Sequence, residues 1–243
     1  MKNHYSHPSN GFTLVEMAMV LFIVTLLLSG LVPTITSQME QQRTNETRKL
    51  ISEISEALIG YAIINGRLPC PADPTKVTGA SGAGAERATC TTAADATGIV
   101  PWATLGTSET DGWGNRFSYR VRTDFADAIA SATYGGCTPS PIPTQASFGL
   151  CSTGNLTVKS ASAGTNVATG IPAIIVSHGK NGAGAWTQKG VQLAAGSNAD
   201  EVENSDGDTD YVSRIQTSDF DDLVAWITPN ILYNRMVTAG KLP

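Results

Sequence analysis

The longest run of apolar residues in the chain lies near its start, at residues 12–32, and Glu16 is the one charged residue within it. At about 1.5 Å per residue, a helix of this length is about 31 Å long, which matches a bilayer core. The run is longer than the apolar part of a secretory signal, and no small-x-small cleavage site follows it. We therefore predict a retained membrane-spanning helix at residues 12–33.

After this run, apolar residues recur at steps of three or four over residues 34–65, which is the spacing of one helix face. Pro33 lacks a backbone donor, so we expect the helix to kink or loosen there. Asn65 and Gly66 end the pattern. The sequence thus predicts one long N-terminal helix, whose first part spans the membrane and whose second part is amphipathic and packs on a domain.

Residues 66–243 are expected to form a loop-rich globular head. Alternating or buried patterns predict short strands at residues 116–121, 156–160 and 171–177. A long helix followed by strands predicts an α+β fold in which the helix packs on one antiparallel β-sheet.

Two short helices are predicted near the end of the chain. Asp219 and the serine before it form the cap of a helix at residues 220–227, where Asp221 and Asp222 complement the helix dipole. A second helix is expected to begin at Thr228-Pro229, because proline is favoured at the first helical position.

The charge of the chain argues against a nucleic-acid partner. The net charge is −5, charged residues make up 15% of the sequence, and no run of basic residues occurs. The segment before the apolar run carries Lys2, His4 and His7 but no acidic residue. This segment should stay cytoplasmic, with the bulk of the chain on the far side of the membrane.

The chain has four cysteines, which are Cys70, Cys90, Cys137 and Cys151. They form no CxxC motif, and His178 is the one histidine beyond the N-terminal segment, so a zinc site is not expected. Outside the cytoplasm they should form disulfides. We favour pairing between sequence neighbours, Cys70–Cys90 and Cys137–Cys151, with four unpaired buried thiols as the alternative.

Motifs for nucleotide binding and nucleophilic catalysis are missing from the sequence. Residues 178–186, HGKNGAGAW, lack the Walker spacing, and neither GxGxxG nor GxSxG occurs. We interpret His178, which follows Ser177, as a loop residue rather than a catalytic base. The chain is therefore not expected to be an enzyme.

The stretch GFTLVE at residues 11–16, with the apolar run behind it, resembles the cleavage and methylation motif of type IV pilins and of type II secretion pseudopilins. The resemblance covers residues 10–33. It implies that residues 1–11 are a leader, that a prepilin peptidase cuts after Gly11, and that Phe12 becomes the N-methylated first residue. It also implies that Glu16 pairs with the N-terminal amine of a neighbouring subunit.

This resemblance implies a single-pass protein of the bacterial inner membrane, with its head in the periplasm. An inner-membrane assembly platform would then add it to other pilin-like subunits in an extracytoplasmic helical filament. We interpret the chain as a pseudopilin of a type II secretion system. The alternatives are a minor pilin of a type IV pilus, acting in adhesion, motility or DNA uptake, and a membrane-anchored binding module that never polymerises.

Parts of the head resemble the major pseudopilin. Residues 111–115, DGWGN, are similar to the start of its sheet, and the Gly-rich turn and acidic stretch after residue 176 are similar to its calcium loop. The resemblance implies Ca²⁺ bound by oxygen ligands. The candidate ligands are Ser177, Asn181, Asp206, Asp208 and Asp210. Residues 183–198 form a longer insertion than that loop has, and a solvated acidic loop without metal is the alternative.

Overall fold

The computed structural model describes residues 11–243, and the side chains of residues 11–27 and 36–243. The chain divides into two compact units between Gln42 and Arg43. The predicted leader, residues 1–11, lies outside the described residues except for Gly11.

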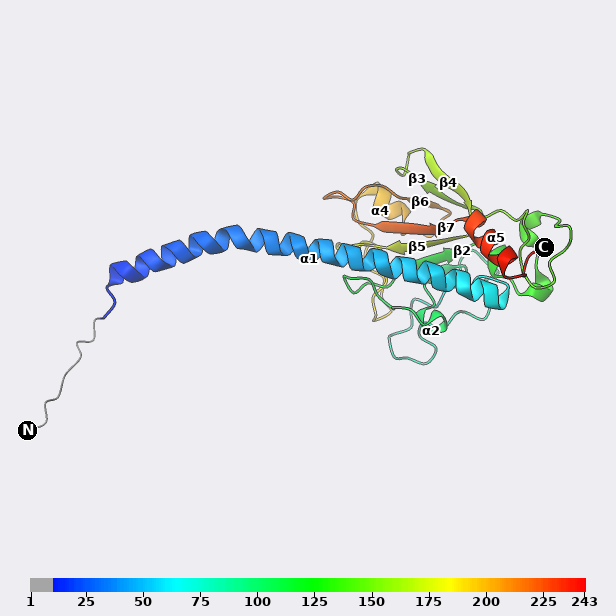
Figure 1. Ribbon diagram of the computed structural model, residues 1–243, viewed down its shortest axis with the longest axis horizontal. Coiled ribbons are helices and arrows are strands. Elements are labelled where there is room, and N and C mark those ends of the chain that lie inside the picture. Colours follow the sequence, from blue (N-terminus) through cyan, green and yellow to red (C-terminus); the bar gives the residue numbers. More distant parts are fainter. Residues whose placement is uncertain (1–10) are drawn as a thin grey trace, which may run out of the picture. The chain divides into compact units, whose positions relative to one another are not determined.

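One helix, α1 (Leu14–Asn65), runs from the first unit into the second (Figure 1). Helical backbone continues through Pro33, so the loosening expected there does not interrupt the helix. Gly66 ends α1 with φ +71°, and a Cβ at this glycine would lie 2.1 Å from a backbone oxygen of Gln145. Only glycine combines this conformation with so close an approach, which is why the helix stops here.

From Arg43 onward, one face of α1 is buried against the head. Ile51, Ile54, Leu58 and Ala62 are spaced by three and four residues and belong to the main hydrophobic core. Their burial confirms the amphipathic pattern expected for the second part of the helix.

The main sheet is antiparallel throughout and has the strand order β1-β2-β5-β7. Its strands are β1 (Thr97–Ile99), β2 (Ser118–Val121), β5 (Ala173–Ser177) and β7 (Leu223–Ile227). Helix α1 packs on one face of this sheet (Figure 1). The predicted α+β class, with a long helix on an antiparallel sheet, is confirmed within the second unit.

A second sheet, which the sequence did not predict, covers part of the other face (Figure 1). It has the order β4-β3-β6, with β3 antiparallel to β4 and parallel to β6. Its strands are β3 (Leu156–Lys159), β4 (Asn166–Ile171) and β6 (Asp210–Val212). The expectation of a single antiparallel sheet is therefore wrong, and β4 forms where a loop was expected.

The helix predicted at residues 220–227 is also wrong, because Leu223–Ile227 forms β7. Its side chains alternate between the two cores: Ala225 packs toward α1, whereas Val224 and Trp226 pack toward the second sheet. Apolar residues on both faces hide the period of a strand.

The remaining helices are short. They are α2 (Trp102–Leu105), α3 (Thr123–Ala126), the 3₁₀ turns η1 (Ile129–Ser131) and η2 (Tyr134–Gly136), α4 (Ala199–Glu203) and α5 (Pro229–Thr238). The last of these confirms the helix predicted from Thr228-Pro229.

Two disulfides staple the long loops of the head. Cys70 pairs with Cys90 and Cys137 with Cys151, with Cα–Cα distances of 5.7 and 5.8 Å. The pairing between sequence neighbours is confirmed, and no cysteine is free in the described chain.

Candidate functional site

The predicted processing site lies just ahead of α1. Gly11 is exposed, and a Cβ added to it would meet nothing within 4 Å. The side chain of Phe12 is 81% exposed. The peptide bond between them therefore lies in an open, non-helical segment, as access by a peptidase requires.

Thr13 and Glu16 bond reciprocally at the start of α1. The Glu16 carboxylate accepts hydrogen bonds from the Thr13 N–H at 3.1 Å and from its hydroxyl at 3.0 Å, while the Glu16 N–H donates to Thr13 Oγ1 at 3.2 Å. This is a capping box, in which each residue satisfies a backbone donor of the other. Glu16 thus has a structural role within its own chain, which the sequence reasoning missed.

Apolar side chains in the first turns of α1, and that of Phe12 just before it, are exposed. They are Phe12, Leu14, Val15, Met17, Met19, Val20, Leu21, Phe22, Ile23, Val24, Leu26 and Leu27. The predicted membrane segment also includes residues 28–33, whose side chains lie outside the described part. Among the residues described, no helix combines the length and the hydropathy that a membrane span requires.

The comparison with known proteins points to the same end of the chain. The prokaryotic N-terminal methylation motif matches residues 7–32. The chain thus carries the signature of type IV pilins and pseudopilins, which implies a structural subunit rather than an enzyme. No curated protein and no solved structure matches the chain.

Two of the predicted calcium ligands have partners of their own at the end of β5. Ser177 is fully buried, and its hydroxyl donates to Asp111 Oδ2 at 2.7 Å. The Asn181 side-chain amide donates to both carboxylate oxygens of Glu201, at 2.8 and 3.0 Å.

The other three predicted ligands lie close together, with Asp206 and Asp208 in the turn before β6 and Asp210 at its first position. The N–H of Asp208 donates to Asp206 Oδ1 and the N–H of Asp210 to Asp208 Oδ1. Oxygens of Asp208, Asp210 and Glu203 come within 4.8 Å of one another. The structure therefore joins Asp206, Asp208 and Asp210, whereas Ser177 and Asn181 bond elsewhere.

His178 lies in the loop directly after β5, as predicted, and it is fully buried there. Its Nε2 lies 2.9 Å from the hydroxyl of Ser118, and burial lowers its pKa to about 4, so the ring is neutral at pH 7. Burial also raises the pKa of Asp111, which accepts the Ser177 hydroxyl. Because Ser177 bonds to Asp111 and His178 to Ser118, the two do not form a nucleophile–base pair.

A second carboxylate cluster was not predicted from the sequence. Oxygens of Glu201, Asp221 and Asp222 lie within 4.8 Å of one another. The two aspartates were assigned to the first turn of a helix, whereas they lie immediately before β7. If residues 223–227 had been predicted as a strand, these aspartates would have been placed at the start of that strand rather than in a helix.

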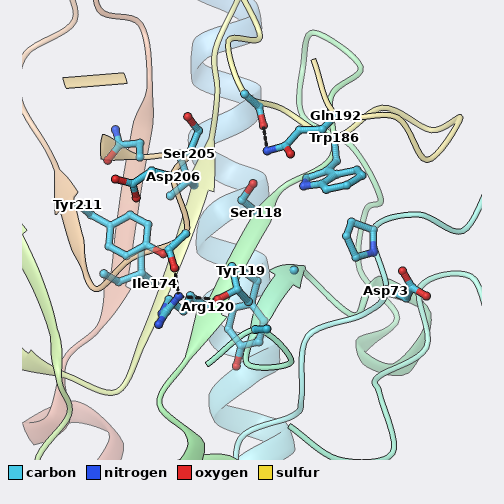
Figure 2. A pocket seen from close by; sticks show the side chains of 18 of the residues that line it. Asp73, Ser118, Tyr119, Arg120, Ile174, Trp186, Gln192, Ser205, Asp206 and Tyr211 are labelled. Carbon is cyan, nitrogen blue, oxygen red and sulfur yellow. Dashed lines mark hydrogen bonds between the residues drawn. The ribbon is translucent and has the colours of Figure 1, made fainter. Parts of the chain in front are cut away.

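A hollow of about 390 Å³ lies on the face of β2 and β5 opposite α1 (Figure 2). Arg120 is buried in its wall, and its guanidinium donates to the neutral oxygens Thr97 Oγ1, at 2.6 Å, and Gly207 O. Guanidinium donors suit carboxylates and phosphates, but Asp73 and Asp206 line the same hollow and would repel them.

Proposed function

We propose that the chain is a subunit of a type IV pilus-like filament that is processed after Gly11 and N-methylated at Phe12. The observation that carries the proposal is the methylation motif at residues 7–32. It coincides with an open Gly11–Phe12 bond and a helix that begins two residues later.

The exposed apolar side chains of residues 12–27 support the same function. A surface of this kind is stable in a bilayer or against similar helices, but not in water. We propose that residues 12–33 span the bacterial inner membrane in the precursor and form the core of the filament after assembly. The head would lie in the periplasm, an oxidising compartment that suits its two disulfides.

Assembly requires a specific contact that aligns neighbouring subunits. We propose that Glu16 pairs with the N-terminal amine that cleavage creates on a neighbouring subunit. Each charge would be costly in an apolar surrounding, and pairing offsets that cost. The partners would be other pilin-like subunits, the prepilin peptidase and the inner-membrane assembly platform.

We also propose which filament system the subunit belongs to. The similarity of residues 111–115 to the major pseudopilin favours a pseudopilin of a type II secretion system. A minor pilin of a type IV pilus is the second candidate, favoured by the loop-rich, disulfide-stapled head. Co-purification distinguishes the two: secretion-system components would support the first, and pilus components the second.

A Gly11→Val variant tests the processing step. No atom lies within 4 Å of the added Cβ, so the fold should not change. We expect the leader to be retained, which mass spectrometry of the intact protein would show, while the wild type begins at a methylated Phe12. Normal cleavage of the variant, or an uncleaved and unmethylated wild type, would favour a membrane-anchored module that never polymerises.

A further inference from the structure

The hollow on the face of β2 and β5 opposite α1 is enclosed by segments that are far apart in the sequence (Figure 2). Its floor is the main sheet, with Ser118 and Arg120 on β2 and Ile174 and Val176 on β5. Its volume of about 390 Å³ falls in the range of pockets that hold small organic ligands. The groups that line it therefore indicate what kind of ligand it would accept.

Arg120 carries a buried charge for which the head provides no counter-ion. The residue is 6% exposed, and its Nη1 donates to Thr97 Oγ1 and Gly207 O. Within the described chain, Nε and Nη2 make no hydrogen bond, and no carboxylate forms an ion pair with this guanidinium. Burying a charge without a partner is costly. These two nitrogens are therefore donors for an anionic group in the hollow.

Tyr211, on β6, contributes a second polar group without a partner. The residue is 5% exposed, and its hydroxyl makes no hydrogen bond to the described residues, although buried tyrosine hydroxyls usually have a partner. Burial raises the pKa of Tyr211 despite the opposing effect of the Arg120 charge, so the hydroxyl keeps its proton at pH 7. It can thus donate to the same anionic group as Arg120.

The hollow also carries negative charge. The charged residues that line it in the described chain are Asp73, Arg87, Arg120 and Asp206, two of each sign. Hydrogen bonds from Thr75 lower the pKa of Asp73, which is therefore ionised at pH 7. An anion would be attracted by the arginines but repelled by the aspartates, and the reverse holds for a cation. A ligand that carries both charges is attracted by both pairs.

Aromatic side chains lie on two sides of the hollow. In the view of Figure 2, Tyr211 is on one side and Trp186, which is partly exposed, is on the other. Aromatic rings pack against apolar groups, and their faces attract ammonium groups. Together with Ile174 and Val176 in the floor, they favour a ligand with an apolar body.

We propose that this hollow binds a free α-amino acid with an apolar side chain, whose carboxylate meets the guanidinium of Arg120 and the hydroxyl of Tyr211. The amine of such a ligand lies beside its carboxylate. Asp206 would accept it, because the charge of Asp206 acts on Tyr211 and this residue is therefore close to the carboxylate end of the site. Binding does not require a filament, so the inference does not depend on the proposed function.

The test is isothermal titration calorimetry on the full chain, purified in detergent, with protein-free micelles as the blank. The probes are L-leucine and L-phenylalanine, and we expect at least one to bind once per chain with a Kd of about 1 mM or tighter. Analogues of the tighter binder that lack either the amine or the carboxylate should bind about 10-fold more weakly, because each loses charged hydrogen bonds.

Two variants test the assigned contacts. Tyr211→Phe removes a hydroxyl that has no partner in the described chain, so Tm should not fall, while the Kd of the amino acid should rise about 10-fold. Asp206→Asn should weaken binding of the amino acid but strengthen binding of the analogue without an amine, because a charge that repels the carboxylate is removed. A merely structural role of Asp206 would not produce these opposite effects.

Asp208→Asn is the matched control. Asp208 is exposed in the same turn and accepts one backbone N–H, as Asp206 does, but it does not line the hollow. This variant should bind the amino acid like the wild type.

Four results would each overturn the proposal. The first is that neither amino acid binds, and the second is that glucose binds more tightly than both, which would indicate a site for neutral polar ligands. The third is that Asp206→Asn lowers Tm without ligand, which would identify Asp206 as the counter-ion of Arg120. The fourth is that Tyr211→Phe binds like the wild type or that Asp208→Asn binds like Asp206→Asn.

Discussion

Glu16 lies in the first turn of α1, close to the chain end that the proposed processing would create. Its carboxylate caps the helix through Thr13, and in the proposed filament it also meets the amine of another subunit. Both roles need an acceptor at this position, but only the second needs a charge. The two roles can therefore be separated by substitution.

We predict that Glu16→Gln keeps the cap and loses assembly. Glutamine accepts the same hydrogen bond in a capping box but carries no charge. Processing and helix content by circular dichroism should be unchanged, while incorporation into sheared filaments should fall about 10-fold or more, since a charged hydrogen-bond pair is lost.

The control for this prediction is Thr13→Ala, which removes the cap, at a cost of about 1 kcal/mol, but keeps the carboxylate. This variant should still enter filaments. Wild-type incorporation of Glu16→Gln would exclude the charge as the assembly contact.

Thr47 is the residue at which α1 holds the DGWGN turn. Thr47 is fully buried. Its hydroxyl accepts a hydrogen bond from the N–H of Gly112 at 3.0 Å and donates one to Arg43 O at 2.8 Å. Thr47→Val keeps the shape but leaves the Gly112 donor unpaired. We expect a loss of about 1–3 kcal/mol in the free energy of unfolding, measured by urea titration.

The matched control is Thr238→Val on α5. Thr238 makes the same kind of bond to the carbonyl four residues earlier, but it is exposed. Its replacement should change stability by about 0.5 kcal/mol or less. Equal losses in the two variants would show that the Gly112 contact contributes nothing.

At the scale of elements, whether the sequence predicts a helix or strand depends on which of its faces are buried. The second part of α1 buries one face, and its period of three and four residues was visible. The strand β5 is buried along its whole length, and its run of apolar residues was recognised. In contrast, β7 contacts a core on each face, and β4 is mostly exposed, so neither shows polar–apolar alternation.

The candidate sites follow a similar rule. The roles of Gly11, Phe12 and Glu16 stay predictions, but the three residues form a local motif that the sequence alone shows. The cluster of Glu201, Asp221 and Asp222 joins residues about 20 positions apart through the packing of β7, which no local pattern contains. The candidate calcium residues were chosen from the resemblance to a calcium loop, and of these the structure brings together Asp206, Asp208 and Asp210.

The disulfides stabilise elements that have little regular structure. Their loops span 20 and 14 residues, so the chain-entropy model gives about 3 kcal/mol for each. We predict a loss of this size for the Cys137→Ala/Cys151→Ala double variant, measured by urea titration. Treatment of the double variant with a reductant should then affect only the Cys70–Cys90 disulfide. An unchanged free energy of unfolding in the double variant would mean that the Cys137–Cys151 disulfide does not stabilise the head.

At the scale of the whole molecule, residues 43–243 form one compact unit that includes the second part of α1. Five buried α1 residues, Ile51, Ile54, Leu58, Ile59 and Ala62, contribute to its main core. The head thus includes part of the helix that the sequence assigned to a separate extension at residues 34–65.

We predict that a fragment of residues 43–243 folds alone and unfolds cooperatively on heating. A fragment of residues 66–243 should lack a cooperative transition, because four large aliphatic side chains would leave the core at about 2–5 kcal/mol each. Circular dichroism melting of both fragments is the measurement. A cooperative transition in the shorter fragment would show that the head does not need α1.

The packing of α1 along the main sheet also determines how the head resists a pulling force. Within the second unit the helix lies lengthwise beside β2, β5 and β7 (Figure 1). A pull applied at Arg43 along the helix axis therefore loads its contacts with the sheet in shear, so that they resist together. The same force applied perpendicular to the helix axis would separate the contacts between α1 and the sheet one helical turn at a time. The head thus resists tension along its helix better than a force across it.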